Sequence, residues 1–338
     1  MNSKERIKRI ISRQPADRCG FWLGNPHWET WPILFDYFGT SEEEEIRRIL
    51  HDDFRWIQAG TYIHPEGKPM LDMQRKGPEL SAGGCFSDCE SIAEVENYDW
   101  PDPKYLNFEQ TVRDLKSSQD FYCASGFWSP FFHEVCDFFG MEEYFIKMYS
   151  HPDVIHAVTR HLVEFYIEAN LRFFKAAGDL VDGFFFGNDL GGQSDILISP
   201  ELFKEFIFPY FRKLTELGHE YNKQVILHSC GSIYRVIPDL IGFGVDAIHP
   251  LQAKAARMDA NTLANEFKEQ VCFIGGIDTQ DLLVNGNPDD IRREVDRIRG
   301  VLGPNLIISP SHEAILPNVP PENIVAMAEE TTGLKCEF

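Results

Sequence analysis

The chain has 338 residues, of which 43% are hydrophobic and 25% are charged, a composition typical of a globular protein with a large core. Its formal net charge is −21 at pH 7, so its surface repels nucleic acid and anionic lipid, and both are excluded as partners. No stretch approaches the roughly 20 apolar residues that a membrane-spanning helix needs. Because no secretory signal is present, the eight cysteines are expected to be reduced thiols in a cytoplasmic protein.

The predicted elements alternate between strand and helix from one end of the chain to the other. Residues 1–13 form a short amphipathic helix, and the apolar runs that follow are separated by polar loops and helical patterns. The later runs are apolar on both faces, which indicates parallel strands covered by helices. This alternation favours an α/β fold, a (β/α)8 TIM-type barrel, with one domain over residues 1–338. The eight predicted strands are residues 20–23, 54–57, 121–124, 183–186, 224–227, 246–248, 271–274 and 306–309.

Several helices carry clear start signals. Three are predicted to begin at the prolines at positions 200, 288 and 321, where a fixed φ suits the first helical turn. A further helical pattern, residues 142–177, is expected to break at Pro152. Residues 62–106 are rich in Gly, Pro and Asp and predict a loop that lies over one mouth of the barrel.

The strongest chemical signal is a His-x-Cys pair at the end of the fifth predicted strand. That strand ends at His228, and Cys230 lies two residues further on, so both side chains are expected at the catalytic face of a barrel. An imidazole and a thiolate at this spacing can bind a soft or borderline divalent metal. Taken alone, the pair also fits a helix N-cap turn with an incidental thiol. Cys85 and Cys89 are interpreted as loop thiols, since no further ligands lie at a fitting distance.

Eight short segments together resemble the uroporphyrinogen decarboxylase superfamily. The resemblance covers most of the chain and implies that superfamily's barrel, in which one branch decarboxylates uroporphyrinogen without a cofactor. The other branch comprises cobalamin-dependent methyltransferases, which carry zinc on His-x-Cys plus a distant Cys. The segments are GNDLGGQ at 187–193, HSCGS at 228–232, IPDLI at 237–241, GVDAI at 244–248, PLQ at 250–252, GGIDT at 275–279, SPSH at 309–312 and VPPEN at 319–323.

The two branches are separated by the loop after the first strand and by the position of the distant Cys. Members of the decarboxylase branch carry arginines in that loop, whereas residues 24–29 read GNPHWE, and the acidic surface also disfavours a substrate with eight carboxylates. In the methyltransferase pattern, His312 stands where the branch has its Cys. The resemblance therefore implies a zinc site of His228, Cys230 and His312 with one open position. Imidazole in place of thiolate would make the metal a stronger Lewis acid and a bound thiolate a poorer nucleophile.

Five further residues are expected at the same face. Asp189 is the candidate catalytic residue, orienting a metal-bound His or accepting a proton, although an N-cap or Asx turn explains it equally well. Asn25 and His27, in the loop after the first strand, are candidate substrate-binding residues. Gln252 and Asp278 are candidates of the same kind, and capping of the following helix is the simpler interpretation of Asp278.

These features favour zinc-dependent methyl transfer between methylcobalamin and a small-molecule substrate. The Asp-x-His-x-x-Gly signature of corrinoid proteins is absent, so cobalamin is expected on a separate partner protein. Relatives are often dimers, and the resemblance leaves a homodimer open. One alternative is a cofactor-free lyase that decarboxylates a small or tetrapyrrole carboxylic acid. The other is a non-catalytic barrel that binds a corrinoid or a metabolite, and zinc content separates the first function from both alternatives.

Overall fold

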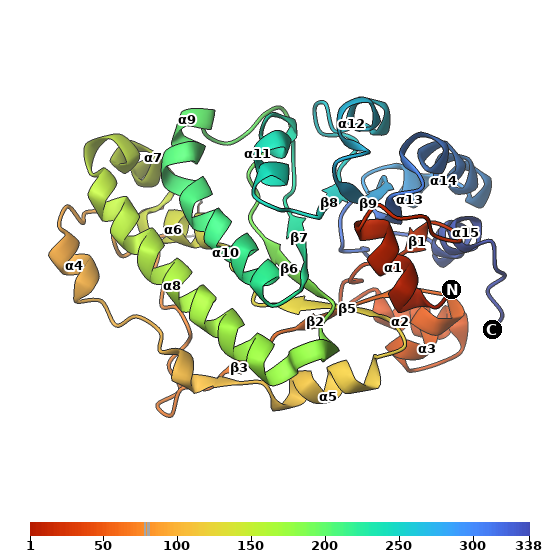
Figure 1. The fold of residues 1–338 in the computed structure, drawn as a ribbon, viewed down its shortest axis with the longest axis horizontal. Helices are drawn as coiled ribbons and strands as arrows, with labels where there is room; N and C mark the ends of the chain where they lie inside the picture. Colours follow the sequence, from red (N-terminus) through yellow and green to blue (C-terminus); the bar gives the residue numbers. More distant parts are fainter. Residues whose placement is uncertain (78, 80–81) are drawn as a thin grey trace.

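A computed structural model describes residues 1–77, 79 and 82–338 and contains eight parallel strands curved into a nearly closed barrel (Figure 1). All eight predicted strands are confirmed, and the fold class is as expected. Around the barrel the order is β1, β10, β9, β8, β7, β6, β5 and β2. The bounds are β1 Gly20–Phe21, β2 Phe54–Gln58, β5 Tyr122–Gly126, β6 Gly183–Gly187, β7 Gln224–His228, β8 Ala247–Leu251, β9 Cys272–Ile277 and β10 Leu306–Pro310.

Helices cover the outside of the barrel. The predicted break at Pro152 separates α7 from the long helix α8, which lies beside α10 (Figure 1). The helix predicted from Pro200 begins there as α9 and continues through one π-helical turn, residues 203–207, into α10. The helices are α2 Trp31–Phe38, α3 Glu43–Ile49, α5 Glu109–Ser117, α6 Phe131–Phe139, α7 Met141–Ser150, α8 Pro152–Ala177, α9 Pro200–Leu202, α10 Phe208–Glu220, α11 Ile237–Gly242, α12 Ala260–Phe267, α13 Leu282–Asn285, α14 Pro288–Leu302 and α15 Pro321–Thr332.

The first helix, α1 (Ser3–Ile11), closes the N-terminal end of the barrel. Its Ile7, Ile10 and Ile11 are fully buried and belong to one apolar cluster with inward-facing strand residues such as Phe54 and Ile226. The amphipathic pattern of residues 1–13 therefore marks a plug whose apolar face fills the barrel from below. Because that end is filled, only the end formed by the carboxyl termini of the strands can hold a site.

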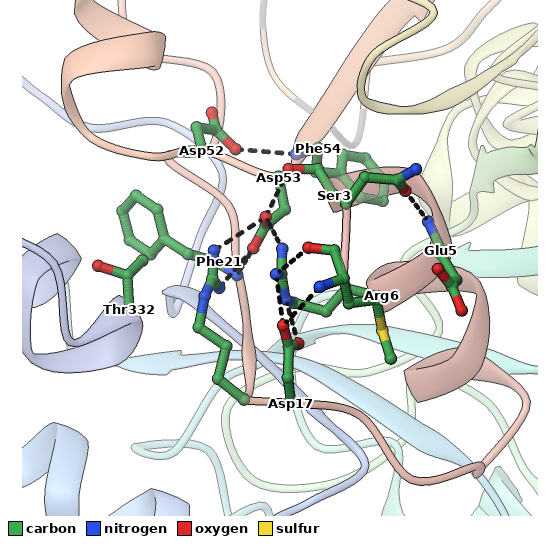
Figure 2. A network of polar contacts seen from close by, with 12 residues as sticks. Ser3, Glu5, Arg6, Asp17, Phe21, Asp52, Asp53, Phe54 and Thr332 are labelled. Atoms are coloured by element: carbon green, nitrogen blue, oxygen red, sulfur yellow. Dashed lines mark hydrogen bonds and ion pairs between the residues drawn. The ribbon is translucent and has the colours of Figure 1, made fainter.

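A buried carboxylate joins the first and second strands, where the sheet is otherwise open. Among the described residues β1 and β2 are the two edges of the sheet and form no ladder with each other, yet the backbone N–H of Asp53 donates to Phe21 O at 3.0 Å. The Asp53 side chain completes the junction by accepting from Phe21 N at 3.1 Å, from Arg6 at 2.8 Å and from Arg18 at 2.7 Å (Figure 2). Ser3 of α1 also donates to it, at 2.8 Å. Asp53 therefore connects β1 and β2 with the helix α1, which fills the N-terminal end of the barrel.

The segment predicted as a loop over one mouth takes a different position. It contains little regular structure: β3 Thr61–Tyr62 pairs with β4 Leu106–Asn107, and α4 spans Ile92–Glu96. Its aromatic side chains pack on α6 and α8, with Phe86 stacked on Phe138 and Trp100 stacked on His161. The prediction was wrong because the aromatic rings of this segment bury their apolar surface against the outer helices α6 and α8.

Glu134 of α6 is a buried carboxyl group whose protonation should make stability depend on pH. Burial raises its pKa to about 7, although Tyr166 Oη donates to it at 2.5 Å. Between its usual pKa of 4.5 and about pH 7, the folded protein holds a proton that the unfolded chain has released. Stability should therefore fall as pH rises through this window, by up to about 3 kcal/mol at pH 8.

Glu134→Gln should remove most of this dependence, because the amide imitates the protonated acid. Urea unfolding at pH 5 and pH 8 measures it, and Glu142→Gln, at an exposed carboxyl in α7, is the matched control. A variant that keeps the pH slope of the wild type would contradict a neutral Glu134 in the folded state.

Candidate active site

Three loops at the carboxyl ends of the strands bring the predicted chemical groups together. Asp189 follows β6, His228 ends β7 with Cys230 just beyond it, and His312 follows β10. Gly231 has a φ of +83°, and a Cβ there would lie 2.2 Å from Gly191 O, so only glycine allows the loops after β6 and β7 to touch. The convergence expected from the sequence is therefore present, and it depends on this close backbone contact.

His228, Cys230 and Asp189 have three ligand atoms in a compact cluster. His228 Nε2 lies 3.3 Å from Cys230 Sγ and 3.4 Å from Asp189 Oδ1. Zinc bond lengths and tetrahedral angles would place such atoms about 3.6 Å and about 3.4 Å apart. Asp189 Oδ1 also accepts from the backbone N–H of Cys230 at 2.8 Å, which fixes the carboxylate beside the thiol. The donor set therefore fits a zinc-sized ion, with Asp189 closer to a ligand role than the sequence indicated.

The charges of this cluster stabilise one another. Burial lowers the pKa of His228, but its contacts with Asp189 and Cys230 and the charge of Glu313 outweigh burial and raise it to about 10. Burial raises the pKa of Asp189, and the hydrogen bond and charge of His228 reverse this and lower it to about 2. The pKa of the Cys230 thiol is likewise lowered, since contacts with His228 and His312 outweigh its burial. The cluster thus favours the thiolate that a metal requires.

His249 of β8 is a site residue that the sequence reasoning missed. Its side chain is fully buried, and its Nδ1 lies 3.0 Å from His228 Nδ1. Burial, followed by the charges of His228 and His312, lowers the pKa of His249 well below its usual value, so it is a neutral acceptor. The Nδ1–H of His228 can donate to His249, so the Nε2 lone pair of His228 faces Cys230 once a bound metal has displaced the Nε2 proton. Little in the sequence selects His249, because it lies inside an apolar strand, directly before the segment PLQ at 250–252, and resembles a core residue there.

His312 lies at the edge of the cluster. Its side chain is 42% exposed, and its ring centroid is 6.2 Å from that of His228, at 90°. A contact with Cys230 raises the pKa of His312. Its Nδ1 accepts from the backbone N–H of Ala314 at 3.1 Å, so in this conformation Nε2 carries the proton of the neutral ring. Ligation of a metal through Nε2 would require His312 to give up the contact with Ala314.

The four residues predicted to bind substrate occupy different positions. Asn25 lines the cavity beside the cluster, whereas His27 lies at the surface, 3.5 Å from Glu29. Gln252 is buried and accepts from Gly231 N at 2.6 Å, so it shapes the loop that carries Cys230. Asp278 accepts from the backbone N–H groups of residues 280–282, as a capping residue does.

A cavity of about 340 Å³ opens beside the cluster inside the upper end of the barrel. His228, His249 and Glu313 form its polar side, and aromatic rings form most of the rest. The lining residues that the structure describes include no Lys or Arg. They are Trp22, Asn25, Trp56, Gln58, Ala59, Gly126, Phe127, Trp128, Phe185, His228, His249 and Glu313.

The parallel barrel and the group of His, Cys and Asp at its open end define a class of α/β-barrel proteins with a potential metal centre. Residues 122–333 match the family "Uroporphyrinogen decarboxylase (URO-D)", and the chain belongs to this family. The part matched begins at β5 and includes the loops that carry Asp189, His228, Cys230 and His312. Membership in this family supports an enzyme.

Two relatives have the name Methylcobamide:CoM methyltransferase MtbA. The protein from Methanosarcina mazei is 22% identical over 328 residues, covering 85% of this chain and 86% of its own length. The protein from Methanosarcina acetivorans is 29% identical over 105 residues, covering 31% of this chain and 30% of its own. A solved structure titled "methyltransferase from Methanosarcina mazei" has a TM-score of 0.70 at 15% identity, covering 98% of this chain and 99% of that one, which shows the shared fold. Among the helices of the described residues, none combines the length and hydrophobicity required to span a bilayer.

Proposed function

We propose that this protein is a zinc-dependent methyltransferase of one barrel domain that works with a separate corrinoid protein. The observation that carries the proposal is the cluster of His228 Nε2, Cys230 Sγ and Asp189 Oδ1, spaced as ligands of one tetrahedral ion. The names of the two relatives support methyl transfer with a cobamide as the other reactant. A small-molecule substrate would occupy the cavity beside the cluster.

His228 and Cys230 would hold the metal, with His312 as the third protein ligand predicted from the sequence. When bound, zinc would act as a Lewis acid that lowers the pKa of the substrate heteroatom. Asp189 faces the same point and can orient His228, complete the ligand set or accept the proton that the substrate releases. His249 holds the Nδ1 proton of His228, so that the Nε2 lone pair stays directed at the metal position.

The test is the metal content of the purified protein and its effect on methyl transfer. We expect about one zinc per chain, and we expect loss of the methylcobalamin absorption spectrum in the presence of a phenol or thiol acceptor to require that zinc. Protein that takes up no zinc on reconstitution at neutral pH would rule out this mechanism. The lyase and the binding-protein functions would then remain.

The decarboxylase alternative makes a separate prediction. The loop after β1 offers no arginine, and no Lys or Arg lines the described part of the cavity, so the eight carboxylates of uroporphyrinogen would meet Glu313 without the guanidinium groups that could bind them. Coproporphyrinogen production from uroporphyrinogen should therefore stay at background. Saturable turnover would show that cations such as Arg55, Arg75 or Arg257 reach the substrate.

A further inference from the structure

The aromatic part of the cavity carries information about its ligand. Trp22 and Phe185 are 1% exposed and form its floor, while Trp56 and Trp128 are partly exposed walls. The two wall rings meet edge to face, with centroids 6.0 Å apart and planes at 89°, and Trp128 lies 5.7 Å from Phe185. A flat ring can stack on one wall while the other wall contacts its edge.

Unpartnered polar atoms are concentrated at the same cavity. Seven buried side-chain atoms of the described residues have no hydrogen-bond partner, and four of them belong to residues that line this cavity. They are Trp22 Nε1, Trp56 Nε1, His249 Nε2 and Glu313 Oε2. Glu313 Oε2 is 3.5 Å from His228 Nδ1 and 3.6 Å from His312 Nδ1, too far for a hydrogen bond. Buried polar groups are normally paired, and these four atoms belong to residues that line the cavity, so a ligand bound there is placed to supply the missing partners.

The chemistry of these atoms restricts the ligand. An indole N–H can only donate, so Trp22 and Trp56 require acceptor atoms, and oxygen substituents on a ring provide them. The Glu313 carboxylate can only accept, and neither nearby histidine donates a hydrogen bond to its Oε2, so a ligand hydroxyl is the group that would complete it. A methylated ammonium ion would satisfy Glu313 and the aromatic walls, but it would leave both indole N–H groups unpartnered. An anionic ligand would meet Glu313 with no Lys or Arg among the described lining residues.

We infer that the cavity binds an uncharged aromatic ring with oxygen substituents, at least one of them a hydroxyl or a methyl ether. This inference rests on the proposed function, for which it names the small-molecule reactant as an aryl methyl ether or the phenol formed from it. In demethylation, the bond between oxygen and the methyl carbon breaks, its electron pair stays on oxygen, and a proton is taken up there. The methyl group passes to the cobalt(I) corrinoid on the partner protein, which supplies the electron pair of the new bond.

The test is calorimetric binding of 2-methoxyphenol to the full-length protein, with and without added zinc and without any corrinoid. We expect one site per chain, and at least tenfold weaker binding of tetramethylammonium and of benzoate. Trp56→Phe keeps a ring but removes one N–H and should weaken binding about five- to tenfold. Trp100→Phe is the matched control, because Trp100 lies outside the cavity and its Nε1 already donates to Val95 O at 2.8 Å.

A second variant keeps the inference testable if Trp56→Phe does not fold. 1,2-Dimethoxybenzene lacks the hydroxyl of 2-methoxyphenol, so it should bind more weakly to the wild type, and Glu313→Gln should reduce that difference. Tighter binding of tetramethylammonium than of 2-methoxyphenol would overturn the inference, as would a hydroxyl preference that Glu313→Gln leaves unchanged. Zinc uptake without 2-methoxyphenol binding would contradict only this inference, whereas ring binding to a protein that takes up no zinc would contradict only the proposed function.

Discussion

Cys230→Ser is expected to lose most of the bound zinc. A serine hydroxyl is a far poorer zinc ligand than the thiolate that the contacts of Cys230 with His228 and His312 favour. Methyl transfer should fall by at least a hundredfold, because the substrate heteroatom would no longer be activated. The free energy of unfolding should change little, since the barrel core is packed without the metal. Metal analysis, a methylcobalamin assay and urea unfolding measure these three quantities.

Cys85→Ser is the matched control for this experiment. Cys85 is an exposed thiol in the segment that packs on α6 and α8, outside the cluster. We expect it to retain zinc and activity. If Cys230→Ser kept its zinc, or if Cys85→Ser lost the same amount, the assignment of Cys230 as a ligand would be wrong.

Asp53→Ala should be the most destabilising single substitution that we predict. The carboxylate is fully buried and accepts hydrogen bonds from Ser3, Arg6, Arg18 and the backbone of Phe21 (Figure 2). Its removal would leave the buried Arg6 guanidinium with only the half-exposed Asp17 as an ionic partner and would weaken the seam between β1 and β2. Breaking a buried ion pair in this way costs about 3–5 kcal/mol. Urea unfolding should show this loss in the free energy of unfolding.

Asp17→Ala tests whether burial is the reason. Asp17 also pairs with Arg6, at 2.7 Å, but its side chain is 40% exposed. Solvent screens such a pair, so a loss of about 1 kcal/mol or less is expected. Equal losses for the two variants would show that Asp53 contributes through its contact with Arg6 alone and not as the junction of the barrel seam.

Much of the site could be predicted because its residues lie beside recognisable strand ends. The strand that ends at His228 is a short apolar run, and the carboxyl end of a barrel strand is where functional side chains lie. That rule is local, so the chain itself places His228 and Cys230 at the open end of the barrel, whereas the resemblance to the superfamily made them candidate metal ligands. Gln252 and Asp278 follow the same rule, yet their side chains accept from backbone N–H groups of nearby loops. The position of a residue after a strand therefore predicted which loop carries it, but it did not predict which group its side chain contacts.

By itself the sequence determined the barrel, because apolar runs and helix starts repeat along the chain and each signal depends only on neighbouring residues. Only the tertiary structure decided that the isoleucines of α1 fill the barrel, that Asp53 closes its seam and that His249 contacts His228. Each of these contacts joins residues separated along the chain, and a buried histidine inside an apolar strand looks like core until its neighbour is known. The cavity likewise exists only where side chains from several strands leave space, which no local pattern specifies.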